Sequence, residues 1–436
     1  MGKPEIRFKG YTDEWEQRKF GSLLEETRNK TTVEDEDTLL SCAIDGMYLN
    51  SELFSHFRGS SNIGYLKIKK NDLILSAQNL HLGNCNVNLR FEHGIISPAY
   101  KVYELVGCNP LFMQAWVKKD STKDFFLKAS TEGASVCRKN IVWEELYKQE
   151  LPIPNIEEQT KVGEYFNSLD HLITLHQRKC AEIKSLKKYM LQKMFPQNEQ
   201  KVPEIRFEGF TEAWEQRKLG EICESFEYGL NAAAKEYDGE NKYIRITDID
   251  DNSHEFIQDD VTSPDIDLTN SENYQLKYGD VLFARTGASV GKTYIYKESD
   301  GLVYYAGFLI RGRVKSNYSP EFIFQNTLTD DYDKFIRITS QRSGQPGVNA
   351  QEYASYEISV PKFEEQQKIG AYFSTLDHLI TLHQRKSIPH PNHSTTHTKH
   401  KGEEKYVRIR VNDRGKIDRT ANLRRFPVDI PGRFKN

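Results

Sequence analysis

The chain carries one helical sequence twice, as EEQTKVGEYFNSLDHLITLHQRK at residues 157–179 and as EEQQKIGAYFSTLDHLITLHQRK at residues 364–386, an offset of 207. After the first copy begins, apolar residues recur every three or four positions from Val162 to Met194, which is the spacing of one helix face. Because Pro196 is the first proline after this pattern starts, we expect one helix over residues 157–194. It would be roughly 57 Å long, and so narrow an apolar stripe needs a partner helix.

The second copy supplies that partner. Each copy follows a different globular segment, and we predict that the two helices pack antiparallel as a coiled coil. The residues expected in the contact are Val162, Phe166, Leu169, Ile173 and Ile183 in the first helix, and Ile369, Phe373, Leu376 and Ile380 in the second. The alternative is two unrelated helices, each packed on its own domain.

A second block is also repeated. PEIRFKGYTDEWEQRKFG at residues 4–21 returns as PEIRFEGFTEAWEQRKLG at residues 203–220, with 13 of 18 positions identical. The long stretches between the repeated blocks, about 22–150 and 221–357, do not match well. A repeated frame around two different inserts predicts two different binding domains held in related positions.

The inserts are strand-rich. Short apolar runs at 72–76 and 280–284 follow turn residues, and a further pair of strand-like runs lies at 95–105 and 302–310. The repeat aligns these runs, so we predict one scaffold with different loops. The expected fold class is α+β with an internal pseudo-twofold repeat. The expected domains are 1–150 and 201–357 as recognition domains, 151–200 and 358–387 as spacer helices, and 388–436 as a divergent basic tail.

Composition excludes several classes of protein. The 436 residues are 37% apolar without a run of 18 apolar residues, so no membrane span is predicted and we expect a cytoplasmic protein. Six scattered cysteines without a C-x-x-C pair argue against a zinc site or a disulfide framework. The net charge is −3, although residues 388–436 carry 12 Lys and Arg against 5 Asp and Glu. Any contact with nucleic acid must therefore come from local basic loops or from a partner.

Three motifs resemble catalytic or ligand sites without meeting their requirements. The run 287–293 resembles a phosphate-binding loop, but it has three residues between its glycines where four are needed. The run 97–100 resembles a methyltransferase motif but lacks its second proline. The histidine pairs 171/176 and 378/383 are five residues apart, whereas helical metal ligands are usually four apart. We therefore predict no catalytic residue and no metal site.

The corresponding loops of the two inserts differ in their polar residues, and these are the candidate DNA-reading positions. Gln and Asn can bond adenine at two points, and Arg or Lys can bond guanine. The alternative for each is an ordinary turn with solvated side chains. The candidates are Gln78, Asn79, Asn84 and Arg138 in the first insert, and Arg285, Thr286, Lys292, Arg342 and Gln345 in the second.

Residues 1–387 resemble the specificity subunit of bacterial type I restriction–modification enzymes. The resemblance is carried by the twin PEIRF…WEQRK entries, the twin EEQ…LDHLITLHQRK helices, and YGDVLFARTGASVGK at residues 278–292. It implies a non-catalytic chain that recognises double-stranded DNA, each insert reading one half of a split target. The helices would set the distance between the halves and dock two modification subunits.

The resemblance also places the cofactors in partner chains. Modification subunits would use S-adenosylmethionine to methylate adenine, and restriction subunits would use ATP and Mg²⁺; this chain would hold no cofactor. The sequence departs from the family pattern after Lys386, where prolines at 389 and 391 replace the continuation of the helix. We expect the start of the first helix to be partly uncovered as a result. The alternatives are a truncated or recombined specificity chain impaired in assembly, a coiled-coil adaptor that does not bind DNA, and an enzyme acting alone.

Overall fold

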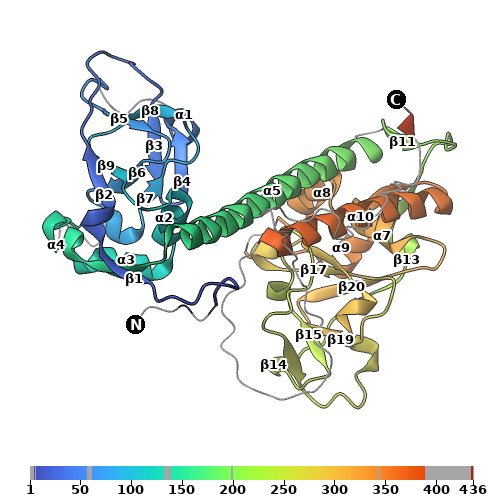
Figure 1. Cartoon of the computed structure of the whole chain (residues 1–436). Coiled ribbons are helices and arrows are strands. Elements are labelled where there is room, and N and C mark those ends of the chain that lie inside the picture. Colours follow the sequence, from blue (N-terminus) through green and yellow to red (C-terminus); the bar gives the residue numbers. More distant parts are fainter. Residues whose placement is uncertain are drawn as a thin grey trace. The chain divides into compact units, whose positions relative to one another are not determined.

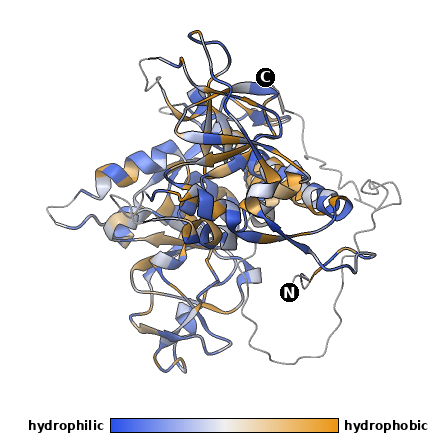
Figure 2. Cartoon of the chain, turned by 60° about the vertical axis from the view of Figure 1, so that its left-hand side comes forward, coloured by the Kyte–Doolittle hydropathy of each residue, from blue (hydrophilic) through white to orange (hydrophobic). Residues whose placement is uncertain are grey.

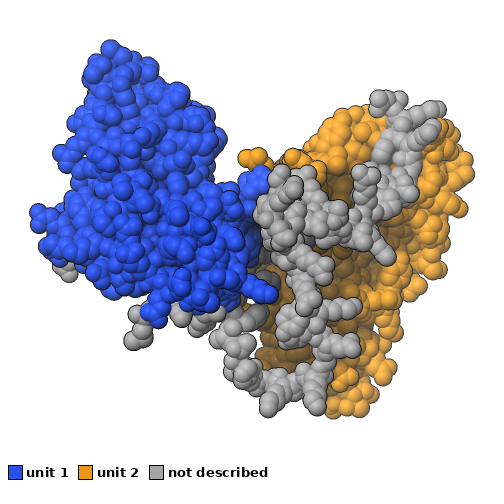
Figure 3. Space-filling model, in the orientation of Figure 1, with its two compact units in different colours: residues 1–174 blue, residues 175–436 orange. Residues whose placement is uncertain are grey.

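The computed structural model describes residues 4, 6–55, 61–131, 139–197, 200–341, 344–387 and 434–435. They form two compact units, residues 1–174 and 175–436, which Figure 3 distinguishes by colour. Both units combine strands and helices, as Figure 1 shows, so the predicted α+β class is confirmed. Most helices in Figure 2 show hydrophobic and hydrophilic residues on the same element, the pattern of helices that have one buried face.

Unit 1 is built on a four-stranded antiparallel sheet. Its order is β2 (Leu24–Thr27), β9 (Tyr100–Leu105), β6 (Leu73–Ser76) and β7 (Cys85–Val87). Every residue of β6 and β7 is buried, because these strands lie between the helices and the second layer of strands. The other elements of the unit are β1 (Glu16–Lys19), β3 (Leu40–Ala43), β4 (Gly46–Leu49), α1 (Asn50–Leu53), β5 (Leu66–Lys69), β8 (His93–Ile96), α2 (Pro110–Val117), α3 (Asp120–Lys128), α4 (Trp143–Lys148) and β10 (Glu150–Ile153).

Unit 2 repeats that sheet. Its order is β13 (Cys223–Tyr228), β20 (Leu309–Val314), β17 (Asp280–Ala284) and β18 (Thr293–Ile295), strand for strand the order of unit 1. A second sheet has the order β14 (Ala233–Glu236), β16 (Thr262–Asp265), β15 (Lys242–Ile244) and β19 (Val303–Tyr305). The remaining elements are β11 (Arg206–Phe207), β12 (Glu215–Lys218), α6 (Leu219–Ile222), α7 (Pro320–Asn326), α8 (Asp330–Thr339), α9 (Ala350–Ala354), β21 (Glu357–Val360), α10 (Phe363–Ser387) and β22 (Phe434–Lys435).

The two long helices form as the periodicity predicts. α5 covers Ile156–Met194 and begins in unit 1, and α10 covers Phe363–Ser387. Within unit 2 the second half of α5 packs against α10 in antiparallel direction, visible as the adjacent green and red-orange helices of Figure 1. The contacts run in opposite directions along the two helices: residues 176, 180 and 187 of α5 contact residues 383, 380 and 377 of α10, respectively. The antiparallel arrangement is therefore confirmed for this half of α5.

A buried ion pair fixes each repeated entry block to the helix that follows it. In unit 1, Arg7 donates to both carboxylate oxygens of Glu158, each at 2.7 Å. In unit 2, Arg206 donates to both oxygens of Glu365 at 2.7 and 2.8 Å. Both glutamates are completely buried. Two parallel charge-assisted bonds fix direction as well as distance, which explains why the PEIRF and EEQ motifs recur together.

The next residue of each EEQ motif fixes the globular domain to the same helix. Gln159 Oε1 accepts from the backbone N–H of Asn109 at 2.8 Å, and Gln366 Oε1 accepts from that of Ser319 at 3.1 Å. Asn109 and Ser319 are themselves the N-caps of α2 and α7. The repeated residues thus hold each globular domain in a fixed position on its helix.

Candidate nucleic-acid interface

Two loops of unit 2 that lie about 60 residues apart in the sequence come together beside the end of β17. The backbone N–H of Gly287 donates to the carbonyl of Pro346 at 3.0 Å, and the N–H of Val348 donates to the carbonyl of Arg285 at 2.9 Å. Thr286 pairs with Gly347 as an isolated antiparallel bridge. These bonds bring together three of the predicted positions, namely residues 285, 286 and 345. We call residues 285–289 and 344–348 the unit 2 loop pair.

Among the residues that the structure describes, the contacts of Arg285 leave much of its donor capacity unused. Its guanidinium lies over the ring of Tyr228, 4.8 Å from the ring centre, and Nη1 donates to the carbonyl of Gly307 at 3.4 Å. A guanidinium has five N–H donors in a planar fork, so one long bond does not exhaust them. The side chain is half-buried at the end of a fully buried strand, a placement that limits its rotamers and favours recognition of a planar acceptor pair.

Gln345 faces the turn formed by Gly287. A Cβ atom built on Gly287 would lie 3.2 Å from Gln345 Nε2, and Gly287 has φ +78°, a conformation that glycine adopts without strain. Gln345 itself is exposed. Glycine at 287 therefore permits both the turn and the close approach of the amide, whose donor and acceptor can bond an adenine edge.

Two aromatic side chains of this region were not among the predicted positions. Phe308 is 63% exposed and its carbonyl accepts from the N–H of Arg285 at 3.0 Å, and Tyr228 is 44% exposed under the Arg285 guanidinium. Exposed aromatic rings next to an arginine suit stacking or apolar contact with bases. The sequence signal was the YYAGF run at 304–308, in which a phenylalanine follows directly after a turn glycine.

Unlike the other described candidate positions of unit 2, Lys292 has its charge paired within the domain. Its ammonium forms an ion pair with Asp251 and donates to the carbonyl of Ile249 at 3.0 Å, and its side chain is 11% exposed. These contacts join the 284–293 hairpin to the preceding loop. A structural role thus accounts for this lysine, and its reading of DNA stays a prediction.

In unit 1 the predicted positions follow β6, as residues 285 and 286 follow β17 in unit 2. Gln78 is exposed, and its carbonyl accepts from the N–H of Lys139 at 3.2 Å, so a later loop contacts the loop after β6 as one does after β17. The backbone N–H of Asn79 donates to Ser76 Oγ at 3.2 Å. Asn84 Oδ1 accepts from Cys42 Sγ at 3.5 Å and is half-buried. The predicted Arg138 and Arg342 lie outside the described residues.

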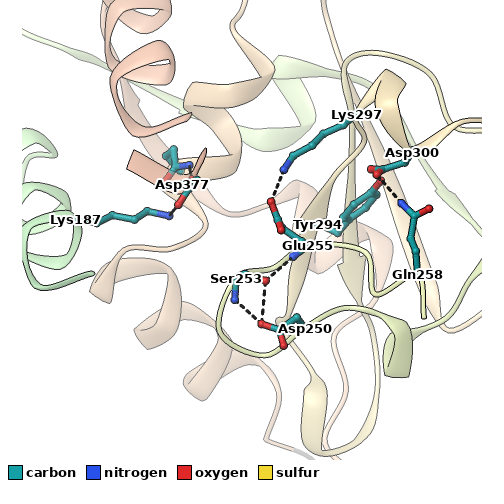
Figure 4. A network of polar contacts seen from close by, with 10 residues as sticks. Lys187, Asp250, Ser253, Glu255, Gln258, Tyr294, Lys297, Asp300 and Asp377 are labelled. Carbon is teal, nitrogen blue, oxygen red and sulfur yellow. Dashed lines mark hydrogen bonds and ion pairs between the residues drawn. The ribbon is translucent and has the colours of Figure 1, made fainter. Parts of the chain in front are cut away.

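A groove of about 750 Å³ lies beside α5 within unit 2. Lys184, Lys187 and Lys188 line one part, and three aspartates, Asp251, Asp333 and Asp377, line it as well. Figure 4 shows Lys187 directed at Asp377, with a donor–acceptor distance of 2.6 Å. Lys292 also lines the groove and pairs with Asp251, so two of its four lysines are paired with carboxylates.

The loop around residue 254 forms the rest of the network in Figure 4. Lys297 pairs with Glu255 at 2.9 Å, and Tyr294 donates to Asp300 at 2.6 Å. Burial lowers the pKa of the neighbouring His254, whose Nδ1 lies 2.8 Å from the carbonyl of Thr293. A neutral, backbone-bonded histidine here supports the loop and adds no positive charge near neutral pH.

The predicted coiled-coil positions divide into two sets. Those in unit 2 are buried, namely Ile183, Ile369, Phe373, Leu376 and Ile380. In the first half of α5, Phe166 is 47% and Leu169 36% exposed, whereas Val162 and Ile173 are half-buried. The expectation that the start of α5 is partly uncovered is confirmed at Phe166 and Leu169.

The described residues also bear on metal binding and membranes. Among them, no three His, Cys, Asp or Glu side chains form a group that could hold a metal ion. Five cysteines are buried free thiols, and burial raises the pKa of Cys42 to about 11. No helix in the described part of the chain is both long and apolar enough to cross a membrane.

Three comparisons with known proteins all find similarity to type I restriction–modification specificity subunits or their domains. Residues 211–388 match the family described as type I restriction modification DNA specificity domain. The type I restriction enzyme MjaVIII specificity subunit of Methanocaldococcus jannaschii is 21% identical over 406 residues, covering 86% of this chain and 88% of that protein. The crystal structure of a type I restriction–modification system S subunit from M. genitalium superposes with a TM-score of 0.60 at 14% identity, covering 89% of this chain and 95% of that one.

Proposed function

We propose that this chain is a specificity subunit of a type I restriction–modification system and that each of its two units reads one half of a two-part DNA target, since residues 211–388 match the type I DNA specificity domain and the chain is similar to a type I specificity subunit over 86% of its length. The observation that carries this proposal is the loop pair at the end of the central sheet. Both units have the same strand order and the same contact between the loop after the inner strand and a later loop. Their side chains differ, because Gln78 and Asn79 in one unit stand where Thr286 and Gly287 follow Arg285 in the other. One scaffold with different loops is suited to reading two different sequences.

The chain itself supplies recognition and positioning. Adenine methylation with S-adenosylmethionine belongs to two modification subunits in this proposal, and ATP- and Mg²⁺-dependent cleavage belongs to restriction subunits. The repeated frame supports two docking sites for identical partners, since a pseudo-symmetric chain offers the same residues twice. The antiparallel helices would keep the recognition domains at a fixed separation and so set the gap between the two halves of the target.

The experiment is to co-express the chain with its modification subunit and map N6-methyladenine across the host genome by long-read sequencing. We expect a motif of two short blocks separated by a fixed gap. Arg285→Ala should relax one position in one block and leave the other block and the gap unchanged. Loss of a two-point contact to a base costs about 1–3 kcal/mol, or roughly 5- to 150-fold in discrimination.

A matched control is Arg217→Ala. Arg217 is an exposed arginine of unit 2 whose guanidinium pairs with Glu215 on β12, on the frame side of the unit. It should leave the motif unchanged. Methylation that is unaltered in both blocks by Arg285→Ala would contradict the assignment of the loop pair to DNA reading. The complete absence of methylation from a folded, partner-bound chain would contradict the proposed function itself.

A further inference from the structure

The two long helices meet at equivalent positions of the repeat. His176 Nδ1 lies 2.9 Å from His383 Nδ1, and residue 383 is the repeat of residue 176. When an antiparallel pair meets at equivalent residues, each contact on one side of that point predicts an equivalent contact on the other. The packing of residues 180–195 on α10 therefore predicts a matching packing of a second such segment on the first half of α5.

Only one of these two faces is covered in the described structure. On α10, Phe373 is completely buried and Leu376 is 7% exposed, and the Phe373 ring lies 5.9 Å from that of Phe195. The equivalent residues on α5, Phe166 and Leu169, are 47% and 36% exposed. Identical side chains at repeated positions thus differ in exposure, and the pair on α10 is covered by the segment that ends at Phe195.

The charges on the two faces follow the same pattern. Asp377 on α10 accepts from Lys187 at 2.6 Å, whereas its equivalent, Asp170, forms no ion pair with any residue that the structure describes and is attracted by Lys118 without direct contact. Residues 180–195 contain four lysines and one glutamate. Residues 162–175 contain Glu164 and Asp170 without a lysine or arginine. The uncovered face is apolar and acidic, and the segment that covers its twin is apolar and basic.

The chain's own sequence does not provide the missing segment. Residues 387–402 are the repeat of 180–195, but they contain Pro389 and Pro391, and the positions that repeat Ile183 and Met190 are both histidine. A helix of that sequence would lack the apolar stripe. A second copy has the right segment, but Ile183 and Met190 are already buried in its own core.

We propose that the first half of α5 is a vacant docking face that binds, from a separate polypeptide, an amphipathic helix with the apolar spacing and positive charge of this chain's residues 180–195. The exposed centre of this face is formed by Phe166, Leu169 and Asp170, and the half-buried Val162 and Ile173 lie at its edges, Val162 packing partly on the core of unit 1. The occupant places a lysine opposite Asp170 and an aromatic residue over Phe166, as Lys187 and Phe195 do at the twin face. This docking does not depend on DNA recognition.

The test uses the whole chain and a fluorescein-labelled peptide of residues 179–196, with binding followed by fluorescence anisotropy. We expect saturable one-to-one binding that Phe166→Asp weakens by at least about tenfold. Leu175→Asp is the matched control, because its repeat, Leu382, stays 37% exposed even where the helix pair is complete. It should leave the affinity unchanged.

A charge exchange identifies the site of binding. Asp170→Lys should weaken binding about three- to fivefold, and the peptide variant Lys187→Glu should restore it. A peptide that instead displaced the chain's own segment from α10 would be insensitive to residue 170, and that result would overturn the proposal. This exchange also serves if Phe166→Asp fails to fold, since Asp170 lies on the surface.

Two further outcomes would overturn the proposal. One is the absence of saturable binding by a chain with a normal circular dichroism spectrum. The other is a dimer in sedimentation velocity that excludes the peptide and that Phe166→Asp dissociates, which would assign the face to a second copy. Neither result would affect the methylation motif, so failure here is distinguishable from failure of the DNA-reading function.

Discussion

The buried ion pair between Arg206 and Glu365 gives a quantitative test of how the repeated frame holds unit 2 together. The Arg206 side chain is 11% exposed and that of Glu365 is completely buried. Glu365→Gln removes the negative charge and leaves the guanidinium buried without a counter-charge, which typically costs 3–5 kcal/mol. The glutamine can still accept one hydrogen bond, so we expect about 3 kcal/mol less stability for unit 2. For a unit of this size, that lowers Tm by roughly 6–12 °C.

The assay is urea and thermal unfolding followed by circular dichroism. Glu158→Gln, the equivalent change in unit 1, should shift the unfolding transition of unit 1 instead, and comparing the two variants identifies the transition of unit 2. Glu215→Gln is the exposed control, since its pair with Arg217 is open to solvent and should contribute less than about 0.5 kcal/mol. Removing both charges with an Arg206→Met, Glu365→Leu double variant should recover most of the loss, because no buried charge is then left unpaired. A single variant within about 0.5 kcal/mol of wild type, or a double variant no better than the single one, would refute this explanation of the repeat.

Three other predictions follow from differences between equivalent positions and from close packing. Phe373→Ala should lower the free energy of unfolding by about 3–5 kcal/mol and Phe166→Ala by less than about 1 kcal/mol, because one ring is buried and the other 47% exposed; equal losses in urea denaturation would contradict this. Gly163→Ala should destabilise unit 1 by about 1–3 kcal/mol, since the added Cβ would lie 2.6 Å from Leu111 Cβ, and an unchanged urea midpoint would show that the helices can separate. Burial raises the pKa of Asp72 to about 6, above its unfolded value of about 4. The stability of unit 1 should therefore decrease as the pH rises from about 4 to about 6, and Asp72→Asn should remove that decrease and add up to about 2 kcal/mol at pH 7; a variant with an unchanged pH profile would disprove it.

The helices and central strands could be predicted because their signals are local or repeated. A three- to four-residue apolar period identifies a helix wherever it occurs, and α5 ends at Met194, two residues before the proline that the prediction used. The partner of this helix could be predicted because the same apolar stripe occurs in both copies of the repeated helical sequence. The absence of a matching sequence after residue 387 was enough to predict exposure at Phe166 and Leu169.

The loop contacts could not be predicted, because they depend on which strands become neighbours. Lys292 was selected as a base-reading residue, yet its ion pair is with Asp251, 41 positions earlier in a loop with no recognisable signal. Tyr228 lies at the end of β13, and it comes under Arg285 only because β20 lies between β13 and β17. The sequence contains the residues of the interface, but the order of the sheet decides which of them meet.

The different surroundings of one repeated aspartate show how far the two units have diverged around a constant scaffold. Asp280 begins β17 and pairs with Arg313 through two bonds of 2.8 and 2.9 Å. Its counterpart, Asp72, accepts from the N–H of Lys69 at 2.8 Å in the same turn, but the nearby Glu104 carries the same sign of charge and helps raise its pKa. The turn uses a side-chain oxygen at this position as a backbone acceptor, whereas the neighbouring strand is free to change. The residues of the repeated motifs hold the helices in place, so changes of this kind in the inserts alter local stability and loop chemistry without moving the helices. We therefore expect specificity to change by exchange of loops on an unchanged frame.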